Sequence, residues 1–416
     1  MKWPYLTEPE QKFSAKFKSS PQHFIVEEIP AYLPAGEGEH LYIWLEKTNL
    51  TTDQVIFRLS QALGMKTKNI GYAGKKDRVG VTRQWLSLWR IKKEQIVDVQ
   101  IPGVTVLQMD YHKNKLRPGH LQGNRFSIFL AEADAAAPGI ARHLFAKLET
   151  TGVANYFGPQ RFGIKGDNQL IGMAILQSDW QRVFRLVLGN PDEVEKSVQI
   201  LQARILYEKG QLTEALNLWP KEQFIPRNLL RRLIETNGDI AKTARRFSGK
   251  QLIFYLHALQ SFWFNRCLAQ RIREINRIWP GDLAYLHKNG AVFRVADAEV
   301  EQERADRFEI SPSGPILGRK MIEPEEKELQ LEAKVFSDGR PDFSGLKSKF
   351  TRRNLDGGRR PYRVPFQNAV VEYDNNRLLL KFDLPAGCYA TSVIRELLKE
   401  NFPEPDYQIP DFTAGN

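Results

Sequence analysis

The chain has few cysteines and no long apolar run. Each of these two absences argues against a class of protein. Its 416 residues include two cysteines, Cys267 and Cys388, which lie far apart and belong to no CxxC pair. This count argues against a disulfide framework and against a thiolate zinc site. No apolar run approaches the roughly 18 residues that a membrane-spanning helix requires, so we expect no membrane partner.

Motifs for metals and nucleotide cofactors are also missing. The seven histidines show neither H-x-x-x-H nor H-E-x-x-H spacing. Gly36-Glu-Gly38-Glu lacks the third glycine of a dinucleotide fingerprint, and no phosphate-binding P-loop motif occurs. We therefore expect no metal and no cofactor. The first residues contain no apolar signal region, so we expect a cytoplasmic protein.

What the chain does have is an excess of positive charge. Lysine and arginine number 60 against 49 acidic residues, a formal net charge of +11. This balance suits a polyanionic partner, although excess charge also serves solubility. With 42% hydrophobic and 26% charged residues, the composition is that of a soluble globular protein, and the length favours two domains over one.

The hydrophobic pattern changes along the chain. Residues 1–131 are rich in alternating, strand-like runs, with a hairpin-like break at 114–120. A helix is expected from Gln54 to about Leu63, preceded by the capping residues Thr51 to Asp53. Residues 165–278 have helical period throughout, and their last helix is apolar enough to be a core helix. The change predicts a domain boundary near residue 150.

The loop between two strand-like runs at residues 70–90 is the best candidate for a site. Gly71 to Gly74 enter it, and Lys75, Lys76 and Arg78 surround Asp77. Glycines allow close backbone approach, and three cations within two residues favour the ionised form of the aspartate. Such a carboxylate could act as nucleophile or base beside a polyanion. An ordinary charged β-turn with solvated lysines is the alternative interpretation.

A second basic segment lies near the end of the chain. Its cations are Lys347, Lys349, Arg352, Arg353, Arg359, Arg360 and Arg363, against the single acid Asp356. Phe350 and Tyr362 are interleaved with them. Cations for phosphates with aromatic rings for stacking are typical of RNA contact. A solvated loop is the alternative.

Several segments resemble, in order, the motifs of the TruD family of tRNA pseudouridine synthases. The resemblance rests on Phe24-x-Val-x-Glu, Gly71-Tyr-Ala-Gly-Lys-Lys-Asp77-Arg, Gly123-Asn124-Arg125-Phe126, Asn155-Tyr-Phe-Gly-Pro-Gln-Arg161-Phe-Gly and Leu384-Pro-Ala-Gly-Cys-Tyr389-Ala-Thr-Ser-Val. Together they span nearly the whole chain. In the family the position of Tyr389 is commonly phenylalanine, so a ring face is kept and a hydroxyl is added.

The resemblance implies an α/β (α+β) fold with the catalytic domain of pseudouridine synthases. That domain has a mixed, mostly antiparallel sheet, which a largely helical TRUD insertion domain interrupts. On this sequence the implied boundaries are 1–150 for the first catalytic part, 151–369 for the insertion domain, and 370–416 for the final strand and helix.

The resemblance also implies the site and the reaction. Asp77 would be the catalyst that isomerises a uridine of tRNA, at position 13 in the family, to pseudouridine. Phe24, Asn124, Phe126 and Tyr389 would enclose the flipped base, since such a base needs a flat apolar face and polar partners for its edge. The candidates for RNA-backbone contact are Lys18, Lys75, Lys76, Arg78, Arg161, Arg352, Arg353, Arg359 and Arg360.

We expect the protein to act on tRNA as a monomer. Two other functions are open at this stage. An RNA-binding protein or RNA chaperone could keep the fold without catalysis, although the intact Asp77 motif argues against this. A glycosidase or nuclease would use paired carboxylates, and Asp77 has no acidic neighbour in its motif.

Overall fold

The structure is a computed structural model that describes residues 1–8, 12–18, 20–191, 195, 197–247, 249–345 and 355–412. The chain divides into two compact units. The sheet unit comprises Thr7–Val153 and Val364–Phe402, and the helical unit comprises Met1–Leu6, Ala154–Arg363 and Pro403–Asn416. The chain passes from one unit to the other within the short strands β8 (Val153–Ala154) and β13 (Arg363–Val364).

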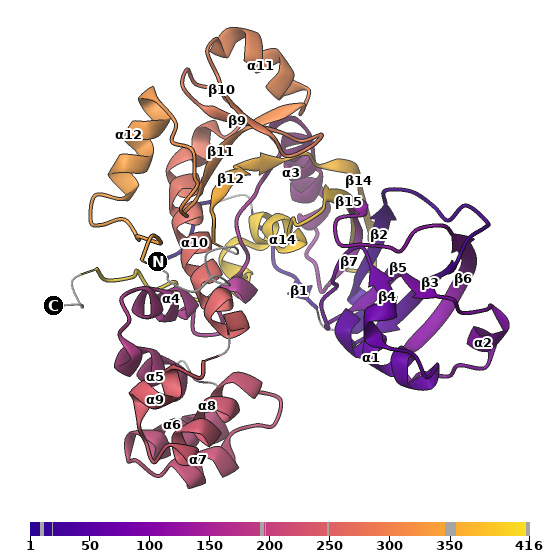
Figure 1. Cartoon of the computed structure of the whole chain (residues 1–416). Coiled ribbons are helices and arrows are strands. Elements are labelled where there is room, and N and C mark those ends of the chain that lie inside the picture. The colour runs from indigo at the N-terminus through magenta and orange to yellow at the C-terminus, as the bar shows by residue number, and fades with distance from the viewer. Residues whose placement is uncertain are drawn as a thin grey trace. The chain divides into compact units, whose positions relative to one another are not determined.

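The sheet unit is built on one mixed sheet, drawn with its strands labelled in Figure 1. Its order is β14-β15-β7-β2-β5-β3-β6, with β1 on β7 and β4 on β5. Of the registered pairs, β2 with β5 is parallel and the others are antiparallel. The strands are β1 (Lys16–Phe17), β2 (Phe24–Pro30), β3 (His40–Thr48), β4 (Ile70–Tyr72), β5 (Val81–Trp89), β6 (Val104–His112), β7 (Leu121–Ala131), β14 (Gln367–Asp374) and β15 (Arg377–Pro385). The predicted mixed, mostly antiparallel sheet is confirmed.

Four helices belong to the sheet unit: α1 (Thr52–Ala62), α2 (Glu94–Val97), α3 (Ala137–Thr151) and α14 (Ala390–Leu398). The expected helix after Thr51 is confirmed as α1, where Thr51 and Gln54 form a capping box. Val55, Ile56 and Leu59 of α1 pack on buried leucine and isoleucine side chains of β3 and β5. Burial of this apolar face holds α1 against the sheet, so the turn before it is fixed too.

The expected hairpin around 114–120 is wrong. β6 pairs with β3 at one edge of the sheet, whereas β7 lies between β2 and β15. The turn residues instead serve a longer connection, in which Gly119 N–H donates to the carbonyl of Ala73 at 2.9 Å. Pro118-Gly119 predicts a local turn, but a turn alone does not determine which strands pair.

The helical unit is organised around α10 (Gly249–Arg271), which is the apolar core helix that the sequence predicted. Its other helices are α4 (Asn168–Leu176), α5 (Trp180–Leu188), α6 (Val198–Glu208), α7 (Leu212–Leu218), α8 (Phe224–Glu235), α9 (Ile240–Ala244), α11 (Ala298–Asp306) and α12 (Glu326–Val335). A small sheet runs in the order β10 (Val292–Arg294), β9 (Leu283–Leu286), β11 (Ile310–Ile316), β12 (Gly358–Pro361). Figure 1 shows α5 to α9 gathered at one end of this unit.

His257 and Cys267 both lie on α10, and Cys267 is fully buried, as expected of a packing residue. The unit boundaries fall at 153/154 and 363/364, near the implied 150 and 369. Residues 403–416, which the resemblance placed with the last strand and helix, group instead with the helical unit. In the part of the chain that the structure describes, no helix is long and apolar enough to span a membrane.

Candidate active site

Asp77 lies on the loop between β4 and β5, and neighbouring segments fix the backbone of that loop. The amide of Lys76 donates to Oγ1 of Thr52 at 2.9 Å, at the start of α1. Asn49 N–H donates to the carbonyl of Gly80 at 3.1 Å. Gly80 has φ +120°, and a Cβ there would lie 2.5 Å from the carbonyl oxygen of Phe24. Only glycine allows the loop to pass this close to β2.

The Asp77 side chain is exposed, and it makes no hydrogen bond or ion pair with a described residue. Two ammonium groups nevertheless interact with it electrostatically, those of Lys18 and Lys47. Lys47 Nζ donates to the backbone carbonyl of Asp77 at 3.0 Å and to that of Leu50 at 2.6 Å. The loop therefore presents a carboxylate to solvent beside two cations that come from other segments.

Burial is the main influence on the pKa values of Lys47 and Lys18. It lowers the pKa of Lys47 to about 8, and the nearby Asp77 opposes that shift. Burial also lowers the pKa of Lys18, again opposed by Asp77. Lys18 Nζ lies 4.2 Å from the centre of the Phe24 ring, within cation–π distance. Lys18 thus links the aspartate to the aromatic part of the site.

The cations next to Asp77 in the sequence have other partners. Lys76 is buried, and its Nζ lies 3.1 Å from Glu28, whose carboxylate also accepts from Trp85 N–H. Burial raises the pKa of Glu28, and Lys76 opposes that shift. The prediction that Lys76 contacts RNA is therefore wrong, because its ammonium group is inside the sheet unit. Lys76 and Glu28 form a buried ion pair that fixes the loop to β2.

Lys75 and Arg78 remain on the surface. Lys75 Nζ pairs with Asp53 at 2.8 Å, with both side chains more than half exposed. Arg78 Nε donates to the carbonyl of Asn49 at 3.4 Å. Both are open to an RNA phosphate. The sequence did not predict that Lys18, after β1, and Lys47 of β3 also interact electrostatically with Asp77.

The predicted base-binding residues of β2 and β7 lie on one face of the sheet. Phe24 and Phe126 are both mostly buried, with ring centres 6.3 Å apart. Asn124 faces Glu28 across the same strand pair, and Phe126 faces Val26. Directly opposed residues of antiparallel strands share a face, so Phe24, Asn124 and Phe126 project to the same side.

Asn124 has an unused acceptor. Its Oδ1 is buried and has no hydrogen-bond partner among the residues that the structure describes. An unpaired buried carbonyl oxygen costs about 1–3 kcal/mol, so this atom requires an explanation, and a bound ligand is one. It can accept from a nucleobase N–H, which is the role that the resemblance implies.

Tyr389 comes from the far end of the chain. It precedes α14 and follows β15, whose Leu384 pairs with Asn124 and whose Pro385 pairs with Gly123. This register places the end of β15 beside the start of β7, where the base-binding residues begin. Tyr389 is half-buried. The sheet unit thus carries Asp77 and all four predicted base-binding residues.

The other predicted RNA contacts belong to the helical unit. Arg161 and Arg360 lie over the ring of Phe157, at 5.6 and 4.3 Å from its centre, and both are partly exposed. Arg352 and Arg353 lie outside the described residues. Arg359 is wrong as an RNA contact, since its side chain is 1% exposed and pairs with Glu332 at 2.7 Å.

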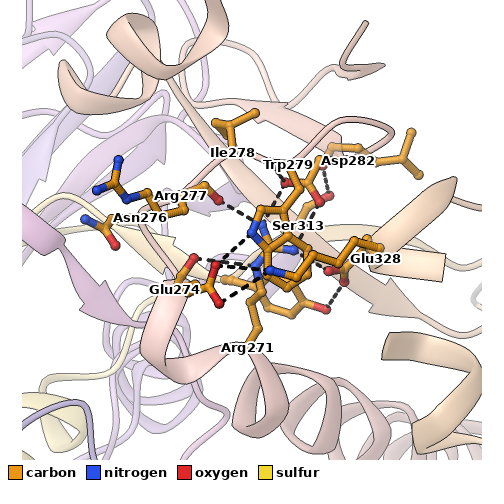
Figure 2. Close-up of polar contacts among 12 residues, drawn as sticks. Arg271, Glu274, Asn276, Arg277, Ile278, Trp279, Asp282, Ser313 and Glu328 are labelled. Carbon is orange, nitrogen blue, oxygen red and sulfur yellow. Dashed lines mark hydrogen bonds and ion pairs between the residues drawn. The ribbon is translucent and has the colours of Figure 1, made fainter. Parts of the chain in front are cut away.

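The described end of the basic segment is part of a buried network. Figure 2 shows Arg271 between Asp282 and Glu328, at 2.8 and 2.6 Å. Tyr362 donates its hydroxyl hydrogen to Glu328 at 2.6 Å, and its ring is fully buried. Arg363 is also buried. Arg359, Tyr362 and Arg363 are therefore core residues, and the prediction of RNA contact is wrong for them, whereas Arg360 is partly exposed.

Sequence reasoning gave no role to Lys47. A signal was present, since Leu41, Ile43 and Leu45 of β3 are fully buried and Lys47 continues the same alternation. A lysine at an inward position of a strand needs partners, and these are the Asp77 loop and Leu50.

Within the described residues, no group of three or more His, Cys, Asp or Glu side chains could hold a metal ion.

Comparison with known proteins agrees with this architecture. A family model described as tRNA pseudouridine synthase D (TruD) matches residues 2–397. A Geobacter sulfurreducens protein named tRNA pseudouridine synthase D is 41% identical over 401 residues, covering 95% of this chain and 96% of that protein. A Thermus thermophilus protein of the same name is 35% identical, covering 96% and 92%. The chain belongs to the TruD family.

A solved structure supports the fold. The crystal structure of a Methanosarcina mazei protein described as a tRNA pseudouridine synthase D superposes with a TM-score of 0.74. The two share 23% sequence identity, and the alignment covers 95% of this chain and 96% of the other. At that identity the likeness concerns the fold alone.

Proposed function

We propose that this protein is a tRNA pseudouridine synthase, an isomerase that converts the uridine at position 13 of tRNA to pseudouridine. Membership of the TruD family over nearly the whole chain supports the reaction class. The observation that carries the assignment of the site is the Asp77 loop. Its backbone is fixed, and its exposed carboxylate interacts with two cations, one of which lies over the Phe24 ring. On this proposal the sheet unit is the catalytic domain and the helical unit is the insertion domain.

The reaction is an isomerisation. The N1–C1′ bond of the uridine breaks, the base turns, and a C5–C1′ bond forms, while C5 loses a hydrogen and N1 gains one. The uridine is neither oxidised nor reduced overall, so no redox cofactor is needed. Asp77 acts either as a nucleophile that attacks the ribose or the uracil base, or as a base that removes a proton from the ribose. Its loop is fixed by Lys47 and Thr52, which keeps the carboxylate in place without rearrangement.

The remaining residues bind the substrate. The rings of Phe24, Phe126 and Tyr389 provide flat apolar surfaces for the flipped base, and Asn124 Oδ1 accepts from its edge. Lys18 lies between the base site and Asp77. The surface cations Lys75, Arg78, Arg161 and Arg360 contact RNA phosphates, which position the RNA without reading its sequence.

Purified protein incubated with unmodified tRNA transcripts and a chelator tests the proposal. Pseudouridine is mapped by carbodiimide-dependent stops of reverse transcription. We expect a stop at one D-arm uridine, lost by at least about 10²–10⁴-fold in Asp77→Asn. RNA binding should persist in that variant, because Asp77 makes no hydrogen bond or ion pair with a described residue.

The matched control is Asp53→Asn, an exposed aspartate near the same loop that pairs with Lys75. It should keep most of the activity. Tight tRNA binding without pseudouridine in any transcript would instead favour an RNA-binding protein. Free uracil or cut RNA as product would indicate a glycosidase or nuclease.

A further inference from the structure

A cavity of about 430 Å³ in the sheet unit lies apart from the residues of the candidate active site. It is lined by Tyr32, His112, Asn114, Lys115, Arg117 and His120. These residues come from the segment after β2, from the last residue of β6 and from the connection between β6 and β7. None of them belongs to the motifs that the sequence analysis singled out.

One wall of the cavity is a stack of aromatic rings. Tyr32 stacks on His112 with ring centres 5.0 Å apart, and the buried Tyr42 lies 5.0 Å from His112 in turn. Asn114 N–H donates to His112 Nδ1 at 2.9 Å, and Asn114 O accepts from the Tyr42 hydroxyl at 2.9 Å. The rings are therefore held in place before any ligand binds, which lowers the entropic cost of stacking.

Hydrogen bonds also leave donors at the histidines. His112 Nδ1 lies 2.9 Å from the amide nitrogen of Asn114 and 3.3 Å from its carbonyl oxygen, and when the nearer amide donates to it the neutral ring carries hydrogen on Nε2. Tyr32 and His120 are joined by a 2.6 Å hydrogen bond between the hydroxyl and Nδ1. When the hydroxyl donates, His120 Nε2 carries the hydrogen in the same way. Both imidazoles then offer an N–H to an acceptor.

The charge of the cavity is positive. Lys115 and Arg117 line it, and none of the six lining residues is acidic. The exposed Arg117 side chain makes no hydrogen bond or ion pair with any residue in the described part of the chain. Rigid stacked rings, imidazole donors and a free guanidinium group match one chemical class, an unpaired nucleotide with its phosphate.

The cavity lies at the opposite end of β2 from Phe24. β2 extends from Phe24, beside the Asp77 loop, to Pro30, and Tyr32 lies beyond its end. At about 3.3 Å per residue, Tyr32 is on the order of 20 Å from Phe24. The cavity and the loop are nevertheless linked, since Gly119 donates to the carbonyl of Ala73, at the start of the loop.

We propose that this cavity binds a second unpaired nucleotide of the substrate RNA, stacked on Tyr32 with its phosphate on Lys115 and Arg117. The inference rests on the proposed function in that the ligand is part of the tRNA. It adds a recognition site separate from the residues proposed to hold the target uridine. Such a site selects RNA that can present two extruded nucleotides at a fixed separation.

The test measures tRNA affinity for full-length variants in an Asp77→Asn background, which removes turnover. Tyr32→Ala should raise Kd by about 10-fold, within the range known for loss of one base stack. Tyr32→Phe keeps the ring and loses the hydrogen bond to His120, so its Kd should lie between that of the protein with Tyr32 and that of Tyr32→Ala. Arg117→Ala should raise Kd and flatten the dependence of log Kd on log salt by about 0.7, the value for one phosphate of a single strand.

Lys92→Ala is the matched control for lost charge, because Lys92 is an exposed lysine of the same unit outside the cavity. It should leave the salt slope unchanged. With Asp77 restored, the cavity variants should raise KM more than they lower kcat. Arg117 is exposed, so its variant tests the idea even where Tyr32→Ala lowers the unfolding temperature.

Wild-type Kd and salt slope in both Tyr32→Ala and Arg117→Ala would overturn the inference. The outcome is separable from that of the proposed function. A wild-type protein that forms pseudouridine while both variants bind normally removes only the second site. A wild-type protein that forms none, with variants that lose affinity, keeps the site and removes the enzyme.

Discussion

Lys47 has two roles at Asp77: it hydrogen-bonds the backbone of the Asp77 loop, and it places a positive charge near the carboxylate. Its Nζ donates to two backbone carbonyls, and a neutral amine still has two hydrogens for them. Deprotonation therefore removes the positive charge beside Asp77 while the loop stays in place. Because burial lowers the pKa of Lys47 to about 8, that charge is lost within the range where an enzyme assay is practical.

We predict that kcat/KM falls as pH rises through about 8, and that Lys47→Arg moves this fall to higher pH. The arginine keeps its charge at all accessible pH values. Lys18→Arg is the control, since the pKa of Lys18 is also lowered by burial and its ammonium group faces the same carboxylate. An unchanged alkaline limb in Lys47→Arg, with the limb moved in Lys18→Arg, would assign the titration to Lys18.

Stability should depend on Lys47 in the opposite sense. The folded protein holds this proton less tightly than the unfolded chain, in which the pKa is 10.5. Between about pH 8 and 10.5 the unfolded state binds more protons, so this group's contribution to stability decreases as pH is lowered through that window. As the pH is lowered through this range, activity should rise while the free energy of unfolding falls. A group with a raised pKa would instead stabilise the protein as the pH is lowered, so the opposite trends identify Lys47.

At the scale of elements, α12 is attached to the core through buried charges. Glu328 of α12 accepts from Arg271 of α10 and from the hydroxyl of Tyr362, and all three side chains are fully buried. Burial raises the pKa of Glu328, and Arg271 opposes that shift. The helix carries few apolar anchors, with Val335 the buried hydrophobic residue on it. Its position therefore depends on satisfied ion pairs.

We predict that Arg271→Met lowers the free energy of unfolding by about 3–5 kcal/mol, because Asp282 and Glu328 are left buried without their cation. Tyr362→Phe should cost about 1–3 kcal/mol, the loss of one donor to a buried carboxylate. Urea unfolding followed by circular dichroism measures both. Arg277→Met is the control on the segment that follows α10, because the Arg277 side chain is exposed and only its backbone carbonyl contacts Arg271, and it should change stability by less than about 0.5 kcal/mol. Equal losses in Arg271→Met and Arg277→Met would contradict this account.

The contrast between Lys47 and the basic segment shows what the sequence could and could not predict. Strands, α1 and the core helix follow from local periodicity and capping, and these were confirmed. The direction of a charged side chain depends on partners distant in the chain. Lys76 with Glu28, and Arg359 with Glu332, are buried pairs that no local pattern reveals. The same composition therefore gives surface charge at Lys75 and Arg78 in one loop and buried ion pairs in another.

At the scale of the whole molecule, the sheet unit contains two separate segments of chain that are held together internally. β7 and β15 pair over eight residues, from Gly123 with Pro385 to Leu130 with Leu378. Thr7 Oγ1 donates to Glu396 at 2.9 Å, and Lys399 Nζ lies 3.1 Å from the same carboxylate. These contacts join the first residue of the unit to its last helix.

The points where the chain leaves and re-enters the sheet unit are adjacent, because β8 and β13 pair with each other. Neighbouring strands are about 4.8 Å apart, a distance that a few residues can bridge. A shortened chain can therefore join Val153 to Val364 through about four Gly and Ser residues, starting at Thr7 and ending at Phe402. Its loop would close at little entropic cost.

We predict that this shortened chain folds by itself, with a single cooperative transition in urea and strand-rich circular dichroism. Glu396→Ala in the same background is the matched control, since it removes the carboxylate between Thr7 and Lys399 and should shift the midpoint to lower urea. A chain that aggregates, or that shows no transition, would mean that the sheet unit needs the helical unit in order to fold. Independent folding would instead fit a catalytic domain into which the helical unit is inserted, and it would allow Asp77 chemistry and RNA affinity to be measured apart.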